Sequence, residues 1–293
     1  MIKKTLYISR DCHLSLKTCQ LVVSFKDDDS ERRVPIEDIG FIVIENQRVT
    51  MTCPLLASLS ENNVAVVFCN KNLMPAAMLQ NLDGNTIQQE TFRNQLEASA
   101  PLKKNLWKQI VVAKIKNQAS LIERIGGDGE LIRNYANNVK SGDEDNREGA
   151  AARIYWHHLF GGDFVRDRYG DRPNQMLNYG YSVLRAAVAR SLTGSGILPS
   201  LGIFHRNRYN AFPLADDLME PFRPFVDEIV FNLVENGEMG LSRDVKAHLL
   251  EVLTCDTLYG HERRPLSVGL SLTTASLARC FAGESKKLVL PEM

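Results

Sequence analysis

The chain has 293 residues, of which 44% are hydrophobic and 24% charged, a composition that excludes a disordered or collagen-like chain. Its 35 basic and 35 acidic residues give a net charge of zero, which argues against DNA binding through bulk positive charge. No apolar run is long enough to span a membrane, and the first residues lack the apolar stretch of a signal peptide. We therefore expect a cytoplasmic globular protein.

The first 80 residues predict a small β-rich domain. Short runs rich in β-branched and aromatic residues, typical of strands, lie at 5–8, 20–25, 40–44 and 64–69. One helix-like stretch at 54–61 interrupts them. Residues 81–90 then predict a linker to a second domain.

From residue 91 onward, apolar residues recur at the spacing of three and four that is typical of helices. This spacing predicts an all-helical catalytic domain over 91–285, followed by a tail at 286–293. Besides the helices around 102–113 and 218–229, we expect helices at 120–140, 147–160, 176–194, 244–258 and 268–283. The expected fold class is thus α+β.

Two basic segments of the helical domain indicate an anionic partner. Residues 101–118 contain five lysines, among them Lys103 and Lys104, and no acid. Residues 141–225 contain ten arginines and no lysine, and the planar guanidinium group suits two-point contacts with phosphate. The second segment also contains ten acids, so ion pairs within the protein explain its arginines equally well.

Three segments hold candidates for metal or acid–base chemistry. Glu148 lies three residues after Asp145, His205 lies in a polar segment, and Asp217 and Glu220 share one face of a helical turn. Each segment also has a purely structural explanation, such as a capping box formed by Asp145 and Glu148. Taken together, two carboxylates and one imidazole favour Mg²⁺ or Mn²⁺ over structural zinc.

Four segments in this order resemble the CRISPR-associated integrase, the Cas-one family, which is the catalytic subunit of the spacer-acquisition complex. They are EGAAARIYW at 148–156, NYGY at 178–181, GIFHRN at 202–207 and LADDLMEPFRP at 214–224. The resemblance spans nearly the whole chain and is greatest to members from type II systems, which accompany a single RNA-guided effector nuclease.

The resemblance implies a site in which Glu148, His205 and Glu220 bind Mg²⁺ or Mn²⁺ and are catalytic. Many relatives have aspartate where this chain has Glu220, whose longer side chain also reaches a metal. Asp217 is the second-ranked acid. The residues expected to contact DNA are Lys103, Lys104, Asn178, Tyr181, Arg206, Asn207, Asn210 and Arg223.

The reaction implied is the insertion of short duplex DNA into a CRISPR array, by attack of a 3′-hydroxyl on a phosphodiester. The implied partners are double-stranded DNA, from the spacer precursor and the repeat array, and the small CRISPR-associated subunit two. A homodimer formed through the β-rich domain and the effector nuclease are implied as well. Two other functions fit the same residues: a metal-dependent nuclease that hydrolyses branched or damaged DNA, and a non-catalytic DNA-binding scaffold.

Overall fold

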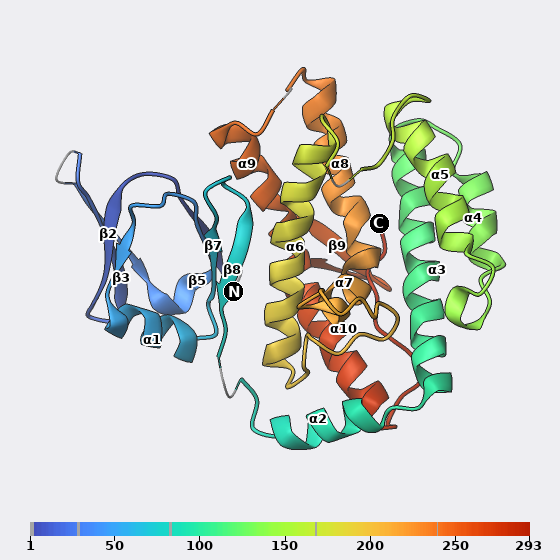
Figure 1. Cartoon of the computed structure of the whole chain (residues 1–293), viewed down its shortest axis with the longest axis horizontal. Helices are drawn as coiled ribbons and strands as arrows, with labels where there is room; N and C mark the ends of the chain where they lie inside the picture. Colours follow the sequence, from blue (N-terminus) through green and yellow to red (C-terminus); the bar gives the residue numbers. More distant parts are fainter. Residues whose placement is uncertain (1–2, 28–29, 82–83, 168, 239) are drawn as a thin grey trace. The chain divides into compact units, whose positions relative to one another are not determined.

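The computed structural model describes every residue except 1–2, 28–29, 82–83, 168 and 239. The chain divides into two compact units, Met1–Gly84 and Asn85–Met293 (Figure 1). Leu82 and Asp83, which belong to the predicted linker, lie outside the described residues. The α+β fold class is confirmed, with a β-rich first unit and a mostly helical second unit.

The described residues of the first unit form two four-stranded sheets and one α-helix. One sheet has the strand order β1-β5-β7-β8 and the other has the order β4-β3-β2-β6. In the first sheet, β1, β5 and β7 are parallel and β8 is antiparallel to β7. The bounds are β1 Lys4–Ile8, β2 Cys12–Lys17, β3 Gln20–Phe25, β4 Glu31–Pro35, η1 Ile36–Asp38, β5 Ile39–Ile44, β6 Thr50–Met51, α1 Cys53–Glu61, β7 Ala65–Cys69 and β8 Pro75–Leu79.

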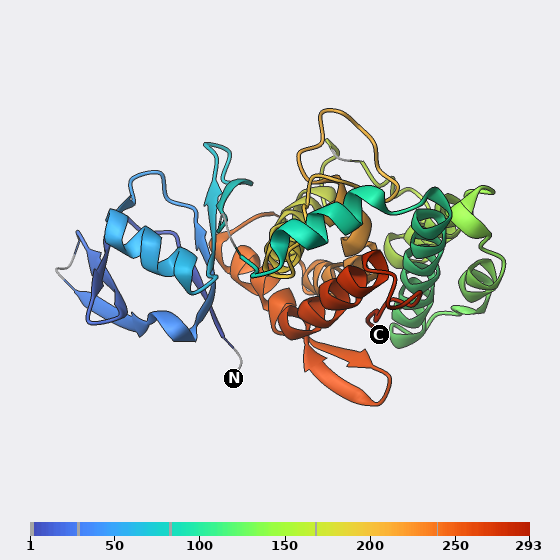
Figure 2. The ribbon, with the colours of Figure 1, turned by 90° about the horizontal axis from the view of Figure 1, so that it is seen from below.

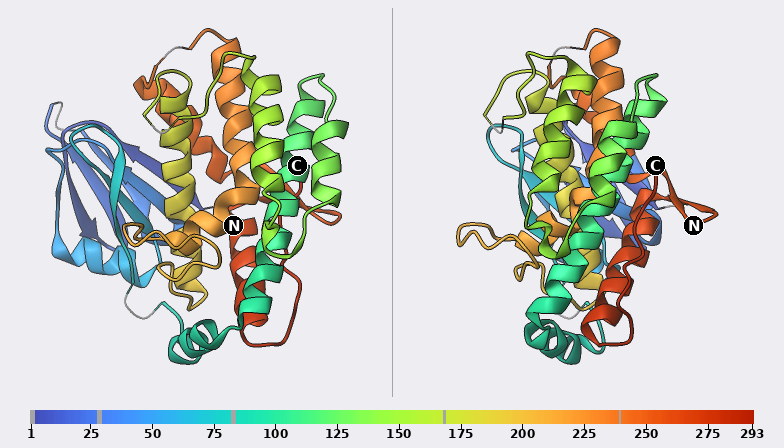
Figure 3. Two further views of the ribbon diagram at one scale, coloured as in Figure 1. Left: turned by 45° about the vertical axis from the view of Figure 1, so that its right-hand side comes forward. Right: turned by 90° about the vertical axis from the view of Figure 1, so that its right-hand side faces the viewer.

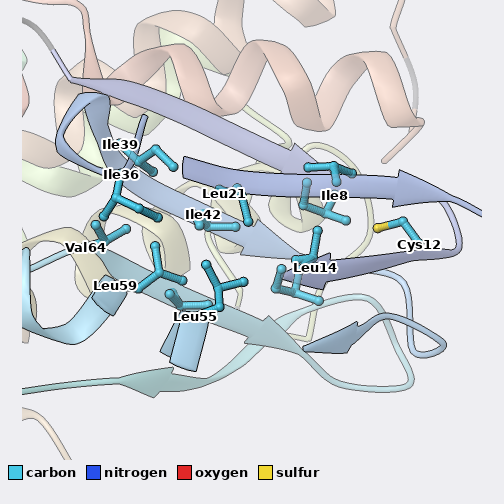
Figure 4. Close-up of a cluster of buried hydrophobic side chains, with 13 residues drawn as sticks. Ile8, Cys12, Leu14, Leu21, Ile36, Ile39, Ile42, Leu55, Leu59 and Val64 are labelled. Atoms are coloured by element: carbon cyan, nitrogen blue, oxygen red, sulfur yellow. The ribbon is translucent and has the colours of Figure 1, made fainter. Parts of the chain in front are cut away.

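A single hydrophobic cluster joins both sheets to helix α1 (Figure 4). Leu14 and Leu21 come from one sheet, Ile42 from the other, and Leu55 and Leu59 from α1. All five side chains are fully buried. Burial of such side chains contributes roughly 1.5–3 kcal/mol each, so the apolar residues of alternating strand positions stabilise this unit.

The part of the second unit that the structure describes is mostly helical and includes the short hairpin β9–β10, which Figure 2 shows at the bottom of the picture. Its elements are α2 Gln88–Glu97, α3 Ala100–Arg124, α4 Glu130–Asn137, η2 Ser141–Asp143, α5 Arg147–Phe160, α6 Asn174–Gly194, α7 Pro213–Met219, η3 Glu220–Phe222, α8 Arg223–Glu235, α9 Arg243–Leu250, η4 Glu251–Leu253, β9 Asp256–Tyr259, β10 Glu262–Pro265 and α10 Leu266–Phe281.

The long helix α3 organises the second unit. It contacts α4 and α5 on one side and the turn η3 on another (Figures 1 and 3). Ser99 caps its start by accepting a hydrogen bond from the Leu102 amide, and its buried side chains include Leu106, Trp107 and Ile110. None of the described helices is both long and apolar enough to cross a membrane.

Two parts of the second unit differ from the sequence prediction. The helix predicted over 120–140 is two helices, because α3 ends at Arg124 and the glycine-rich segment 126–129 separates it from α4. The hairpin β9–β10 follows α9 where a helix was predicted to continue to residue 258. The predicted tail lies against α3: Asn117 donates a hydrogen bond to the Pro291 carbonyl at 3.1 Å.

Candidate functional site

Helix α5 begins with a cap that leaves the Glu148 side chain available for other contacts. Asn146 has a left-handed backbone conformation (φ 49°), and its side-chain oxygen accepts a hydrogen bond from the Gly149 amide at 3.2 Å. Asp143 accepts a second bond, from the Glu148 amide, at 3.1 Å. These two residues therefore cap the helix in place of the predicted Asp145–Glu148 capping box.

Glu220 lies at the junction of two helices. Helix α7 gives way to the single turn η3 and then to α8, so the helical path continues through Pro221. The Pro221 carbonyl accepts a hydrogen bond from the Asn117 side chain of α3 at 2.8 Å, which attaches the turn to the long helix. Glu220 is buried, and Arg223 contacts its Oε1 at 3.0 Å.

Lys114 of α3 brings the two glutamates together. Its Nζ lies 2.5 Å from Glu148 Oε1 and 2.5 Å from Glu220 Oε2. The two carboxylate oxygens are therefore no farther apart than twice that distance, although 72 positions separate the residues in the sequence. Burial favours the neutral form of each group, but the charges of Arg223 and Lys114 outweigh it and lower the pKa of Glu220. Despite its burial, the two glutamates raise the pKa of Lys114.

Asp217 fixes both the backbone and the ring of His205. The carboxylate of Asp217 is fully buried and accepts hydrogen bonds from the amides of Ile203, Phe204 and His205 at 2.6, 2.9 and 3.1 Å. His205 Nδ1 lies 2.6 Å from Asp217 Oδ1, and this hydrogen bond raises the pKa of His205. A side chain at Gly202 would come within 2.5 Å of the His205 carbonyl, so the close turn requires glycine.

Two aromatic rings, Trp107 of α3 and Phe204 of the segment between α6 and α7, pack against the His205 ring. The Trp107 ring stacks on Phe204 with a centroid distance of 4.2 Å and an interplanar angle of 2°. The same indole meets the His205 ring edge to face at 5.8 Å. Trp107 is fully buried whereas Phe204 is 47% exposed, so the indole anchors one face of an aromatic ring whose other parts reach solvent.

A cavity of about 380 Å³ adjoins His205. Its lining is rich in donors from α3 and from the segment 200–213: Lys103, His205, Arg206, Asn207, Arg208 and Asn210. The predicted DNA-binding residues Lys103, Arg206, Asn207 and Asn210 are thus gathered on one cavity. Arg208 joins them, although we did not predict it as a contact residue. Three cationic side chains in one concave site favour an anionic ligand.

The remaining predicted DNA-binding residues make contacts within the protein. Lys104 pairs with Glu144 at 2.8 Å on the surface, where such a pair contributes little to stability. Asn178 accepts a hydrogen bond from Arg166 at 2.7 Å. Both side chains therefore lie outside the group formed by His205 and its cavity.

Tyr181 belongs to a buried cluster around Asp227. Tyr155 donates to Asp227 Oδ2 at 2.7 Å, and Tyr181 donates to Oδ1. Burial raises the pKa of Asp227 to about 6, although both hydroxyl donors and the charge of Arg223 act in the opposite direction. The Arg223 guanidinium lies 4.6 Å from the centre of the Tyr181 ring, so this arginine connects the cluster to Glu220.

The predicted metal ligands are partly assembled. Glu148 and Glu220 converge on a single cation, the Lys114 ammonium. Glu220 Oε2 is buried and contacts the Lys114 ammonium at 2.5 Å, so the cation at this oxygen is a protein side chain. His205 is close enough for its charge to lower the pKa of Glu220. Within the described ranges, however, no three His, Cys, Asp or Glu side chains are gathered closely enough to hold a metal ion. The donor types suit Mg²⁺ or Mn²⁺.

Lys114 is the central residue that the sequence analysis did not single out. It was one of five lysines in a basic segment. Its helical register carries a signal, however, because Lys114 lies seven residues after Trp107 and four after Ile110, on the apolar face of α3. A lysine at a buried position needs an anionic partner, so this position predicts a nearby carboxylate.

Comparisons with known proteins match most of this chain. The family model described as "CRISPR associated protein Cas1" matches residues 6–253. A relative from Neisseria meningitidis, "CRISPR-associated endonuclease Cas1", is 40% identical over 257 residues, which are 86% of this chain and 84% of the relative.

Two solved structures share the fold. The structure "Casposase bound to integration product" has a TM-score of 0.79 at 21% identity and covers 98% of this chain and 92% of that chain. The "Cas6-RT-Cas1--Cas2 complex" has a TM-score of 0.75 at 18% identity, with coverage of all of this chain and 37% of that one. At these identities the likeness describes the fold.

Proposed function

The chain belongs to the Cas1 family of CRISPR-associated proteins, and from this membership we propose that its helical unit catalyses metal-dependent phosphoryl transfer on DNA. The observation that carries the proposal is the convergence of Glu148 and Glu220 on one cation beside His205. Two carboxylates and one imidazole can hold a single divalent metal ion, and such an ion can catalyse phosphoryl transfer at a phosphodiester.

Glu148, Glu220 and the Nε2 atom of His205 are the proposed ligands of Mg²⁺ or Mn²⁺. The bound metal supplies Lewis-acid stabilisation of the charge on the transferring phosphoryl group. Asp217 holds Nδ1 of His205, so the neutral ring directs the lone pair of Nε2 away from Asp217. Asp217 is thus proposed as a positioning residue.

The cationic cavity beside His205 is the proposed binding site for DNA phosphates. Lys103, Arg206 and Arg208 line it, and their charges attract a polyanion independently of base sequence. The exposed edge of Phe204 offers an apolar contact next to these charges. This local concentration of positive charge reconciles DNA binding with the zero net charge of the chain.

The proposed reaction is integration: a 3′-hydroxyl of a short duplex attacks a phosphodiester of the repeat array. The fold shared with a casposase that was solved with its integration product favours this reaction over hydrolysis of branched or damaged DNA. The proposed partners are double-stranded DNA and the small CRISPR-associated subunit two, in keeping with the Cas1–Cas2 assembly among the structural neighbours. Dimerisation through the β-rich unit and contact with the effector nuclease are further parts of the proposal.

A non-catalytic scaffold explains the site less well. That function requires the acids to serve as helix caps, yet Asn146 and Asp143 cap α5. The Glu148 carboxylate instead contacts Lys114, and Glu220 contacts both Lys114 and Arg223. These carboxylates are held for cation contacts rather than for capping.

The test is a strand-transfer assay with a labelled short duplex, unlabelled repeat DNA and the small partner subunit. We expect labelled products longer than the input in Mn²⁺ or Mg²⁺ and none in EDTA, whereas hydrolysis yields shorter products. Glu148→Gln and Glu220→Gln should abolish transfer but retain DNA binding in a gel-shift assay. The exposed substitution Asp163→Asn is the matched control. Full transfer in EDTA contradicts the proposal.

A further inference from the structure

The Lys114 ammonium occupies the position between the two carboxylates proposed to hold the metal. Lys114 is 9% exposed and lies 2.5 Å from each of Glu148 and Glu220. Arg223 supplies a second positive charge at 3.0 Å from Glu220. Two carboxylates thus face two cationic side chains, and this part of the site is electrically balanced by the protein itself.

A divalent cation needs the same oxygens. Positive charges a few ångströms apart repel strongly in a buried site, so a metal ion and the Lys114 ammonium cannot both lie between Glu148 and Glu220. Lysine carries its charge on a flexible four-carbon stem, which lets the ammonium move while α3 stays fixed. Once displaced from a buried ion pair, this charge needs another anion.

A DNA phosphate is the anion that the surroundings favour. Lys103, on the same helix, lines the cavity beside His205 together with two arginines, so phosphates are attracted to this end of the site. The site therefore holds an ammonium on a flexible stem, and the proposed function brings two charges to it: a metal ion for the carboxylates and a phosphate for the lysine.

We propose that Lys114 occupies the metal position in DNA-free protein and transfers to a DNA phosphate when metal binds, so that metal and DNA bind cooperatively. The inference rests on the proposed function, because it takes Glu148 and Glu220 as the metal ligands. Cooperative binding is reciprocal: DNA strengthens metal binding by the same factor by which metal strengthens DNA binding. Lys114 is then the residue that weakens metal binding in the absence of DNA.

The experiment measures Mn²⁺ affinity by the electron paramagnetic resonance signal of free Mn²⁺, with and without a duplex that has unreactive 3′-dideoxy ends. Lys114→Gln removes the charge, Lys114→Arg retains it, and Lys116→Gln is the control for a lost charge at an exposed position of the same helix. Without DNA, Lys114→Gln should bind Mn²⁺ about tenfold or more tightly than wild type. Lys114→Arg and Lys116→Gln should remain close to wild type.

Addition of the duplex should tighten Mn²⁺ binding to wild type and change binding to Lys114→Gln much less. Equal Mn²⁺ affinity of wild type and Lys114→Gln in the absence of DNA overturns the inference but leaves the metal site intact. Absence of Mn²⁺ binding to every variant, with or without DNA, refutes the proposed metal-dependent function itself.

Protein folding is checked by thermal melting in EDTA and in Mn²⁺. Lys114→Gln should melt at a lower temperature than wild type in EDTA, since two buried carboxylates lose their shared cation, and Mn²⁺ should restore more of its stability. If Lys114→Gln does not fold, the inference is tested on wild type alone, by comparing its Mn²⁺ affinity with and without duplex DNA. Equal affinities overturn the inference.

Discussion

Replacing Asp217 by asparagine keeps the shape of this side chain and removes its charge. In the folded protein the Asp217 carboxylate is fully buried and accepts four hydrogen bonds, three from consecutive backbone amides and one at the His205 ring. Each carboxylate oxygen receives two of them. An asparagine turns one oxygen into an NH₂ group, so whichever way the amide is oriented, at least one backbone N–H loses its acceptor.

The loss of this hydrogen bond sets the expected decrease in stability. A buried donor left without an acceptor costs about 1–3 kcal/mol. For a unit of about 200 residues, 1 kcal/mol shifts the melting temperature by roughly 2–4 °C, so Asp217→Asn should melt about 2–12 °C below wild type.

The substitution also acts on the chemistry through the histidine tautomer. If the new NH₂ group faces His205, Nδ1 has to accept a hydrogen bond, and the ring proton moves to Nε2. A protonated Nε2 has no lone pair for a metal, although Glu148 and Glu220 are unchanged. We therefore expect strand transfer to fall sharply while Mn²⁺ binding weakens only in part. The opposite amide orientation instead leaves the Ile203 and Phe204 amides unpaired and displaces the loop.

Thermal melting, Mn²⁺ titration and strand transfer are measured beside the exposed control Asp163→Asn. An Asp217→Asn protein that melts and integrates like wild type refutes the reasoning. Complete loss of Mn²⁺ binding would instead identify Asp217 as a metal ligand. Asp217 would then replace Glu220 as the first-ranked acid of this segment.

Two further predictions concern DNA affinity and pH dependence. Reversing the charge at Lys103 should weaken DNA binding more than at Lys104, which already pairs with Glu144. The double variant should reduce the magnitude of the slope of log affinity against log salt by roughly 1, the contribution of one phosphate contact. An unchanged slope assigns both lysines to the solvated surface. Because the folded pKa of Asp227 is raised from 3.8 to about 6, the stability linked to its protonation is fully present below pH 3.8 and is lost as pH rises through 6. Asp227→Asn should remove that dependence, of about 3 kcal/mol at most, from pH-scanned chemical denaturation, and parallel wild-type and variant curves contradict it.

The sequence predicted strands with continuous apolar runs better than strands whose residues are polar or alternate in polarity. The strands β3, β5 and β7 are continuous apolar runs because they are covered by neighbours, and their bounds agree with the prediction to within a residue. The strands missed in the first unit were β2, β4, β6 and β8. Strand β2 is interior to its sheet but alternates apolar with polar residues. Residues Glu31–Pro35 are charged and largely exposed, and Pro75–Leu79 begins with proline, so neither has the apolar pattern that marks a buried strand.

For the candidate site, sequence motifs identified residue types but not their connections. Glu148 and Glu220 were chosen from segments that resemble a family, and their convergence depends on α3, which precedes both in the chain. Lys114 contacts both carboxylates, and the number of lysines in its segment does not show which of them does so. The role of Asp217 was likewise hidden, because its partners are backbone amides of residues 203–205 that only the turn at Gly202 brings together.

The order of the site's segments along the chain has a consequence during synthesis. The ribosome makes α3 first, then Glu148 on α5, then the loop of His205, and only later the turn with Glu220. Until that turn is made and docked on Asn117, a nascent chain holds Lys114 and one carboxylate but no carboxylate pair. The order of translation therefore keeps shorter nascent chains free of the assembled carboxylate pair, and the pair exists only once about two thirds of the helical unit has been made.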